Sequence, residues 1–319
     1  MLANLFISQM GLMATGGILF AFFATVFLLW TFRNRLPRDL GRDFAVEGKL
    51  SAGKPRGAGF IFVLIFIISV LLFAPWDIET VVYLILLAAS MLTGFLDDRA
   101  EHPWGEYKKA ALDFVIAVAI AVTYINYHGT EVTLLFLNRT VELPVAVFGI
   151  LAVLLVWVSI NVTNCADGVD GLSATLVSVT LLSFYLFDRA VGSGSEDTYL
   201  LLLFVACLLG YLWHNATPSL MLMGDAGSRA MGTWIAITAL KSGAPFLYLL
   251  FAAVLLVDGG IGLVKVALLR FLKIRILTKV RTPLHDHVRK VSGWSNTQAV
   301  FRFAIIQIVI SAAVLYRLF

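Results

Sequence analysis

Charge is scarce in this sequence. Asp, Glu, Lys and Arg make up 14% of the 319 residues, whereas 60% of the residues are hydrophobic. Soluble domains carry about 25% charged residues, and the mean hydropathy here is +0.91. The composition therefore excludes an ordinary soluble protein and predicts an integral membrane protein, which has the lipid bilayer as its solvent.

Cysteine is almost absent as well. Cys165 and Cys207 lie far apart, in or beside apolar segments. This spacing excludes a disulfide framework and a cysteine metal site, so we expect both to be small packing residues. The sequence also contains no internal repeat, no GxGxxG or Walker loop and no stretch that would form a soluble domain.

Long apolar segments are the main feature that is present. A bilayer core of about 30 Å needs about 20 apolar residues as a helix, and helices pair their backbone groups internally. Ten segments qualify: 11–32, 56–75, 79–96, 110–127, 143–162, 171–188, 198–213, 229–240, 244–269 and 299–319. The eighth of them is short. We predict an all-α polytopic protein with about ten transmembrane helices, forming one domain over residues 1–319.

The basic residues predict the orientation in the membrane. If the N-terminus is outside, most of the 24 Lys and Arg residues fall in inside loops. These residues are Arg33, Arg35, Arg38, Arg42, Lys49, Lys54, Arg56, Arg99, Lys108, Lys109, Arg229, Arg270, Lys273, Arg275, Lys279, Arg281, Arg289 and Lys290. Because cytoplasmic loops are enriched in Lys and Arg, we predict outside termini and cytoplasmic basic loops.

The net charge of +4 does not indicate nucleic-acid binding. Basic loops that face anionic lipid and anionic substrates explain it, so we expect a lipid bilayer and no nucleic acid among the partners. Segment 11–32 is long enough to span, so we expect a retained helix and not a signal peptide. Outside loop 129–142 predicts a small extracytoplasmic β-hairpin around Asn138-Arg139.

Acidic residues stand at the ends of two apolar segments. Asp97 and Asp98 leave the third segment together, and Asp225 lies among small residues before the eighth. Two adjacent carboxylates are hard to desolvate without a divalent cation or a basic partner. The alternatives are a hydrated helix end for the Asp pair and a plain helix cap for Asp225.

A longer polar run extends from Asn161 to Gly171. Asn161 and Asn164 are one helical turn apart, so their amides share a face. The dipeptide Asp-Gly occurs twice, at Asp167 and Asp170, and supplies turn geometry with a backbone that a ligand can approach closely. Asp170 could instead simply cap the sixth helix.

The last inside loop contains a further cluster of ionisable groups. His285, Asp286 and His287 are followed by Arg289 and Lys290. Such a cluster could bind a phosphate, bind a metal or shuttle protons. The predicted topology places this cluster, the acidic pair, the Asn-Asp run and Asp225 on the cytoplasmic side.

Two charges lie within the ninth segment. Asp258 and Lys265 flank the region of Gly259-Gly260, and charges inside a membrane are functional candidates by default. The glycine pair could also bend or break this helix.

The four clusters together suit magnesium-dependent chemistry on a diphosphate. Mg²⁺ binds through one or two carboxylates plus substrate phosphates, while cationic side chains hold phosphate oxygens. A lipid acceptor would explain why such an enzyme is embedded in the membrane.

At these clusters the sequence resembles the polyprenyl-phosphate N-acetylhexosamine-1-phosphate transferase superfamily, and within it the phospho-N-acetylmuramoyl-pentapeptide transferases (MraY-type). The motifs that carry the resemblance occur in the family's order and spacing. They are Asp97-Asp98, Asn161-x-x-Asn164-x-x-Asp167-Gly168-x-Asp170-Gly171, Gly224-Asp225-x-Gly227-Ser228, Pro283-Leu284-His285-x-His287, and Gly293-Trp294-Ser295 with Gln298. The resemblance spans essentially the whole chain.

The resemblance implies a reaction. Undecaprenyl phosphate would receive phospho-N-acetylmuramoyl-pentapeptide from its UDP-linked donor, giving lipid I and UMP with Mg²⁺ as cofactor. The family also implies a bacterial cytoplasmic membrane, an active site facing the cytoplasm and a homodimer.

The resemblance further implies roles for individual residues. Asp225 would bind the metal with support from Asp97, and Asp98 would be the base or would position the lipid phosphate. His285 and His287 would contact the diphosphate or the sugar. The substrate-binding set is Lys109, Asn161, Asn164, Asp167, Asp170, Gly224 and Lys265.

Three departures from the family pattern bear on the donor sugar. Asp286 replaces the middle residue of a triple histidine, and Lys54 and Arg56 replace two hydroxyl residues. Asp258 and Lys265 stand where Glu and Gln are expected. One alternative is therefore a relative that transfers N-acetylglucosamine-1-phosphate or a similar group. The other is an ion-coupled transporter, which would place charges near the midplane of the bilayer.

Overall fold

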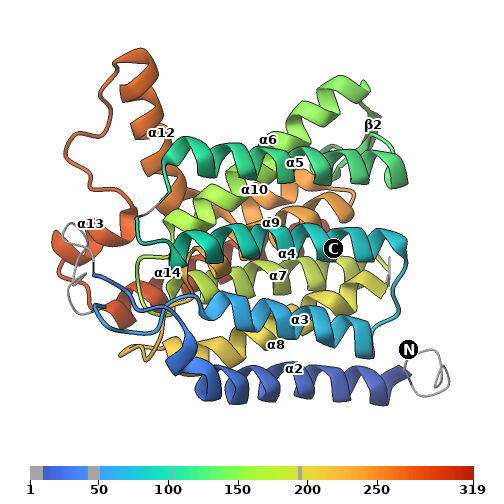
Figure 1. Ribbon diagram of the computed structural model, residues 1–319. Coiled ribbons are helices and arrows are strands. Elements are labelled where there is room, and N and C mark those ends of the chain that lie inside the picture. The colour runs from blue at the N-terminus through green and yellow to red at the C-terminus, as the bar shows by residue number, and fades with distance from the viewer. Residues whose placement is uncertain (1–9, 42–50, 103, 193–195) are drawn as a thin grey trace.

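Long helices dominate the computed structural model, which describes residues 10–41, 51–102, 104–192 and 196–319 (Figure 1). The long helices are α2 (Met10–Phe32), α3 (Ala58–Phe73), α4 (Ile78–Arg99), α5 (Glu106–His128), α6 (Val145–Cys165), α7 (Leu172–Val191), α8 (Glu196–Asn215), α9 (Gly224–Lys241) and α14 (Asn296–Leu318). Each coincides with a predicted apolar segment, because a helix pairs its own backbone groups and needs no partner strand in lipid.

Fewer than ten helices meet the length and hydropathy expected of a membrane span. Seven of the described helices do, or eight if one bent pair counts as a single span. Helix α3 has 16 residues, and α9 carries Asp225, Arg229 and Lys241 within 18 residues. The chain is a multi-pass membrane protein, while its orientation stays a prediction. Arg42 and Lys49, two of the residues on which that prediction rests, lie outside the described residues.

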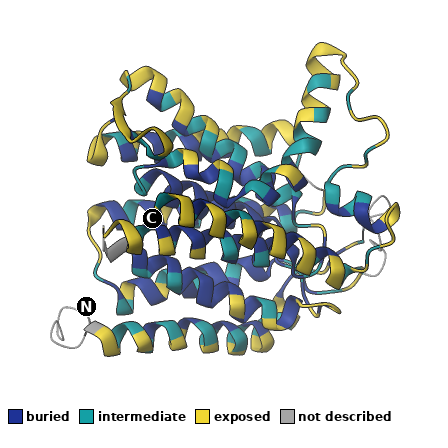
Figure 2. Cartoon of the chain, turned by 180° about the vertical axis from the view of Figure 1, so that it is seen from behind, coloured by how far each residue is buried: buried dark blue, intermediate teal, exposed yellow. Residues whose placement is uncertain are grey.

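Helix α9 occupies the centre of the bundle. Every residue from Gly224 to Leu240 is buried, and α9 packs against α3, α4, α6 and α7. A Cβ at Gly59 would lie 2.0 Å from the backbone nitrogen of Gly227, and one at Gly94 would lie 2.4 Å from the Asp225 backbone. Glycine at these positions allows α3 and α4 to approach α9 closely. The exposed residues lie mainly on the outer helices (Figure 2).

The ninth predicted helix is broken, but not at its glycine pair. It forms η4 (Pro245–Leu247), α10 (Tyr248–Phe251), α11 (Ala253–Leu255), η5 (Leu256–Gly260), α12 (Ile261–Ala267) and η6 (Leu268–Leu272). The 70° bend lies between Phe251 and Ala253, so the expectation of a bend at Gly259-Gly260 is wrong. Gly259 instead lies within the π-helical turn η5. The residue is glycine because a Cβ there would lie 2.3 Å from the Val162 carbonyl oxygen.

A glutamine from another helix stabilises this bend. The Gln307 side chain of α14 accepts a hydrogen bond from the Val254 backbone nitrogen (2.9 Å) and donates one to the Leu250 carbonyl (3.0 Å). Unpaired backbone groups are costly in lipid. Gln307 therefore satisfies the two groups that the bend removes from the helical pattern.

The predicted hairpin is present. Strands β1 (Glu131–Leu134) and β2 (Arg139–Glu142) pair antiparallel, with Val132 opposite Val141. Residues Leu135–Leu137 form a 3₁₀ turn, η3, between the two strands. The hairpin lies at one end of the bundle, and the short helix α13 (Leu284–Lys290) lies at the other (Figure 1).

Candidate active site

Asp98 links the end of α4 to the beginning of α9. Its two carboxylate oxygens accept hydrogen bonds from the backbone nitrogens of Asp225 and Ala226, each at 3.1 Å. Helix α9 has no capping side chain of its own at Met223, so Asp98 satisfies its free N–H groups and complements the helix dipole. A Cβ at Gly224 would lie 2.1 Å from Asp98 Oδ2, which explains the glycine.

Asp225 lies between two basic side chains. Its Oδ1 is 3.3 Å from Arg56 Nη2, and its Oδ2 is 3.2 Å from Lys109 Nζ. Lys109 also forms an ion pair with Asp97 Oδ2, and Asp97 Oδ1 accepts a hydrogen bond from the Trp104 backbone nitrogen (2.7 Å). The structure thus brings Asp97, Asp98 and Asp225 into one acidic cluster, joined by Arg56 and Lys109.

Arg56 was interpreted in the sequence as a loop cation and as a departure from the family pattern, not as a site residue, yet it lies inside this cluster. Its Nε is 2.9 Å from Asp98 Oδ1, and its Nη1 is 3.4 Å from Asp39 Oδ1. Burial by itself would lower the pKa of Arg56, but Asp98, Asp225 and Asp39 outweigh burial and raise that pKa above its ordinary value. Its guanidinium is therefore a permanent positive charge among three carboxylates.

The Asn-Asp run between α6 and α7 joins the same site. Asn164 Nδ2 donates to Ser228 Oγ of α9 (2.8 Å), and Ser173 Oγ donates to Asp167 Oδ1 (2.8 Å). Asp170 Oδ2 accepts a hydrogen bond from the backbone nitrogen of Ser219 (3.1 Å). This run therefore connects α6, α7 and the loop before α9.

The simple capping alternatives do not hold. Helix α7 has Gly171 as its N-cap, with no capping side chain, so Asp170 does not cap it. Asp225 lies in the first turn of α9 and bonds Arg56 and Lys109. The hydrated helix end is wrong for Asp97 and Asp98 too, because both are buried in ion pairs.

His285 is held by Asp258. Its backbone nitrogen donates to Asp258 Oδ1 (2.7 Å), and its Nδ1 lies 2.8 Å from Asp258 Oδ2. Asp258 is fully buried, and a Cβ at Gly168 would lie 2.2 Å from His285 Nε2. Asp258 thus packs α13 against the Asp-Gly turns, and its carboxylate orients the imidazole.

Three predicted substrate-binding or catalytic residues form hydrogen bonds outside the Asp97, Asp98 and Asp225 cluster. His287 Nδ1 accepts from the Arg281 backbone nitrogen (3.3 Å), and Lys265 Nζ donates to the Val280 carbonyl (2.8 Å). Asn161 Nδ2 donates to the Trp157 carbonyl (2.8 Å), and its side chain also bonds Asp113. These bonds tie His287 and Lys265 to the loop before α13.

A buried ion pair behind the site was not predicted. Arg229, one turn after Asp225 on α9, bonds Asp113 of α5 through Nε (3.2 Å) and Nη2. Its Nη2 also donates to the Lys109 carbonyl (3.2 Å). The rule that flags intramembrane charges could have identified Asp113, which lies inside an apolar segment. No local pattern indicated Arg56 or Asp39.

The carboxylates fit a Mg²⁺ site in which substrate phosphates supply some of the ligands. Mg²⁺ takes one or two carboxylates and completes its octahedral shell with phosphate oxygens and water. Asp225 and Asp97, which share the Lys109 ammonium, provide that donor set. Within residues 10–41, 51–102, 104–192 and 196–319, no three His, Cys, Asp or Glu side chains form an all-protein cage.

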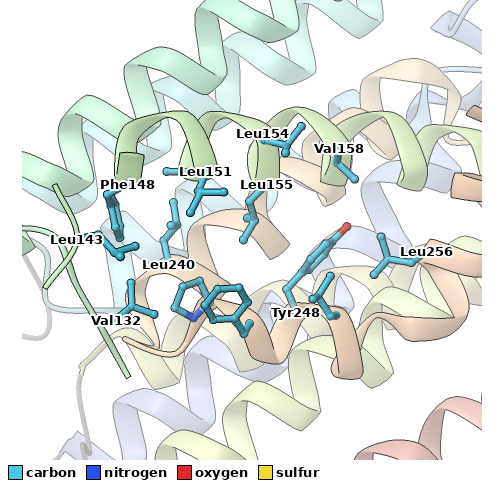
Figure 3. Close-up of a pocket in the computed structure, with 14 residues that line it drawn as sticks. Val132, Leu143, Phe148, Leu151, Leu154, Leu155, Val158, Leu240, Tyr248 and Leu256 are labelled. Atoms are coloured by element: carbon cyan, nitrogen blue, oxygen red, sulfur yellow. The ribbon is translucent and has the colours of Figure 1, made fainter. Parts of the chain in front are cut away.

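An apolar cavity of about 240 Å³ runs along α6 opposite η4 and α10 (Figure 3). Leu143 and Phe148 line one end of it, next to Val132 of β1, and Val158 and Leu256 line the other end.

Comparison with known proteins finds relatives that match most of the chain. Residues 80–243 match the model of glycosyl transferase family 4. The chain is 43% identical over 316 residues to the phospho-N-acetylmuramoyl-pentapeptide-transferase of Treponema pallidum, covering 93% of this chain and 87% of that protein. It is 30% identical to the protein of the same name from Symbiobacterium thermophilum, covering 85% and 84%. The Helicobacter acinonychis protein is 27% identical, covering 95% and 92%.

Proposed function

Because the chain belongs to the phospho-N-acetylmuramoyl-pentapeptide transferase family, we propose that it transfers phospho-N-acetylmuramoyl-pentapeptide from a UDP donor to undecaprenyl phosphate. An oxygen of the lipid phosphate attacks the sugar-bound phosphorus of the donor. A new diphosphate bond forms, the old one breaks, and UMP leaves, so that lipid I and UMP are the products. The observation that carries this proposal is the sharing of Lys109 and Arg56 among Asp97, Asp98 and Asp225.

The acceptor phosphate is proposed to bind at Lys109. This ammonium already holds two carboxylates, and a compact, strongly hydrated cation is suited to phosphate oxygens. Asp225 and Asp97 would hold Mg²⁺, which when bound neutralises charge on the diphosphate. Both oxygens of Asp98 accept backbone hydrogen bonds, which supports a positioning role for Asp98 over a role as base.

The donor is proposed to bind over the Asp-Gly turns. Asn164, Asp167 and Asp170 are anchored through Ser228, Ser173 and Ser219. Preorganised polar groups of this kind orient a substrate without reorganisation during the reaction. His285 packs against Gly168, which supports a place for it beside the sugar-phosphate end of the donor, with His287 further out in the same loop.

The polyprenyl chain is proposed to occupy the cavity along α6 (Figure 3). Apolar residues dominate its lining, so an isoprenoid that enters from the lipid exchanges one apolar surrounding for another and is held by packing contacts. Val158 and Asn164 are six residues apart on α6, which corresponds to about 9 Å along the helix axis at 1.5 Å per residue. A lipid in the cavity would therefore present its phosphate at the level of the acidic cluster.

The membrane arrangement belongs to the same proposal. The basic loops support a cytoplasmic location for the site in a bacterial inner membrane, with both termini and the hairpin outside. We also propose a homodimer, as the resemblance to the family implies.

A direct assay tests the function. Purified protein with polyprenyl phosphate and Mg²⁺ should release UMP from UDP-linked muramoyl pentapeptide, and chelation of Mg²⁺ should stop the release. Asp225→Asn should lower turnover at least about 100-fold, the scale of losing one preorganised electrostatic contact. Release of UMP only from UDP-N-acetylglucosamine would assign the alternative donor, and turnover unaffected by Asp225→Asn would remove Asp225 from the metal site.

A further inference from the structure

Arg56 and Lys109 occupy both oxygens of the proposed metal ligand. Arg56 Nη2 lies 3.3 Å from Asp225 Oδ1, and Lys109 Nζ lies 3.2 Å from Asp225 Oδ2. The same guanidinium is 2.9 Å from Asp98 Oδ1. The Arg56 side chain is 21% exposed, so most of its charge is neutralised by these acids and not by water.

We propose that Arg56 is an internal counter-ion that competes with the divalent cation for Asp225 and binds the donor's diphosphate once the cation has replaced it. This inference rests on the magnesium dependence included in the proposed function. Mg²⁺ binds carboxylate oxygens at about 2.0–2.1 Å. A guanidinium on the same oxygen repels the ion and uses lone pairs that the ion needs, so the two cations cannot both bind Asp225 fully.

The backbone of Arg56 is anchored, so only its side chain needs to move. Its nitrogen donates to the Pro37 carbonyl (2.8 Å), and Arg56 forms a β-bridge with Leu222 next to α9. A guanidinium displaced from Asp225 therefore stays within the cluster. Its planar fork matches phosphate oxygens, which a bound nucleotide diphosphate would bring there.

This arrangement couples metal binding to donor binding. Without a diphosphate, Arg56 opposes the ion at Asp225. With a diphosphate, the guanidinium has a new anionic partner, and the cost of displacing it falls. Because coupling between two ligands is reciprocal, the ion should strengthen diphosphate binding by the same factor.

A matched pair of substitutions isolates the effect of Arg56. Arg56→Gln removes the charge from the cluster. Lys54→Gln removes an equal charge two residues earlier, where Lys54 Nζ contacts Ser219 Oγ (2.9 Å). Arg56→Lys keeps a charge but loses the fork. Retention of α-helical circular dichroism and of the elution volume in detergent shows that each full-length variant is folded.

The measurement is Mn²⁺ binding followed by the electron paramagnetic resonance of the free ion, in the absence of donor and lipid. Mn²⁺ favours the same oxygen ligands as Mg²⁺. Arg56→Gln should bind Mn²⁺ at least 10-fold more tightly than the unsubstituted protein, equivalent to about 1.4 kcal/mol. Arg56→Lys should fall between them, Lys54→Gln should match the unsubstituted protein, and Asp225→Asn should abolish the site.

Addition of uridine diphosphate provides the second readout. It should strengthen Mn²⁺ binding by a larger factor in the unsubstituted protein than in Arg56→Gln, because only the former has a guanidinium to transfer. Equal Mn²⁺ affinity in the two proteins, an equal gain in Lys54→Gln, or no Mn²⁺ binding in any variant would overturn the inference. These titrations need no turnover, so a failure of the transferase assay is recorded separately from a failure here.

Discussion

Removing one partner of the Asp113–Arg229 ion pair should destabilise the protein strongly, whereas removing both should not. The side chains of Arg229 and Asp113 are 2% and 3% exposed, and they join α9 to α5 within the bundle. Loss of either one leaves the other as a buried, unpaired charge, which costs about 3–5 kcal/mol. We therefore expect Arg229→Met and Asp113→Leu each to lower the free energy of unfolding by about that amount.

The double variant should recover most of this loss. Replacing a buried ion pair by apolar residues of similar volume is often neutral or stabilising, by about 1–4 kcal/mol. Arg229 Nη1 has no hydrogen-bond partner among the described residues, which makes this pair weaker than a fully satisfied one. The lost bond to the Lys109 carbonyl costs about 1 kcal/mol in return. We expect a coupling energy of at least about 3 kcal/mol in the double-mutant cycle.

Denaturant titration of the four proteins in mixed micelles, followed by circular dichroism, measures these free energies. Additive effects, or single variants within about 1 kcal/mol of the unsubstituted protein, would show that water or lipid headgroups reach this pair. The burial argument would then be refuted.

Three further substitutions test other contacts of the site. Gly224→Ala places a Cβ 2.1 Å from Asp98 Oδ2 at a φ of 69°, so UMP release should fall at least about 10-fold. The control Gly105→Ala, with open space around it, should leave UMP release unchanged. Equal activities of the two variants would contradict the close approach. Asp258→Asn should lower kcat and change KM by a smaller factor, because the imidazole at the start of α13 loses its orientation. Asp258→Glu should restore part of kcat, whereas changes of equal size in kcat and KM would favour a purely packing role. Gln307→Leu leaves two backbone groups at the bend unpaired. At about 1–3 kcal/mol per group, it should lower the free energy of unfolding by about 2–6 kcal/mol. An unchanged free energy of unfolding would show that the bend rearranges.

Much of the architecture follows from the sequence because it depends on local physics. The length of an apolar run sets the length of a helix in lipid, so nine of the ten predicted segments coincide with one long helix each, the ninth segment being the exception. The hairpin was predicted because two strand-like runs flank Asn138-Arg139, and in the structure Asn138 makes the turn in a left-handed conformation, with a φ of 53°. The bend before Ala253 was missed because its freed groups are satisfied by Gln307, 53 residues away from Val254.

The composition of the candidate site was only partly predictable. Asp97, Asp98 and Asp225 were identified as a group, because each stands at the polar end of an apolar segment. Arg56 was noted only as a loop cation and a departure from the family pattern. Its contact with Asp225 was missed, because the two residues lie 169 positions apart and no local signal pairs them. The resemblance to the family placed His287 and Lys265 near substrate, whereas the structure bonds them to the loop before α13.

The sequence by itself determined that this is a membrane-embedded helical protein with carboxylates at the ends of its helices, because hydropathy and chain length are properties of contiguous residues. Only the tertiary structure decided which charges meet. The rotation of each helix about its axis and the approach of α3 and α4 to α9 over glycines select Arg56 and Lys109 as the partners of Asp225. Those angles depend on packing across the whole bundle, which no short stretch of sequence contains.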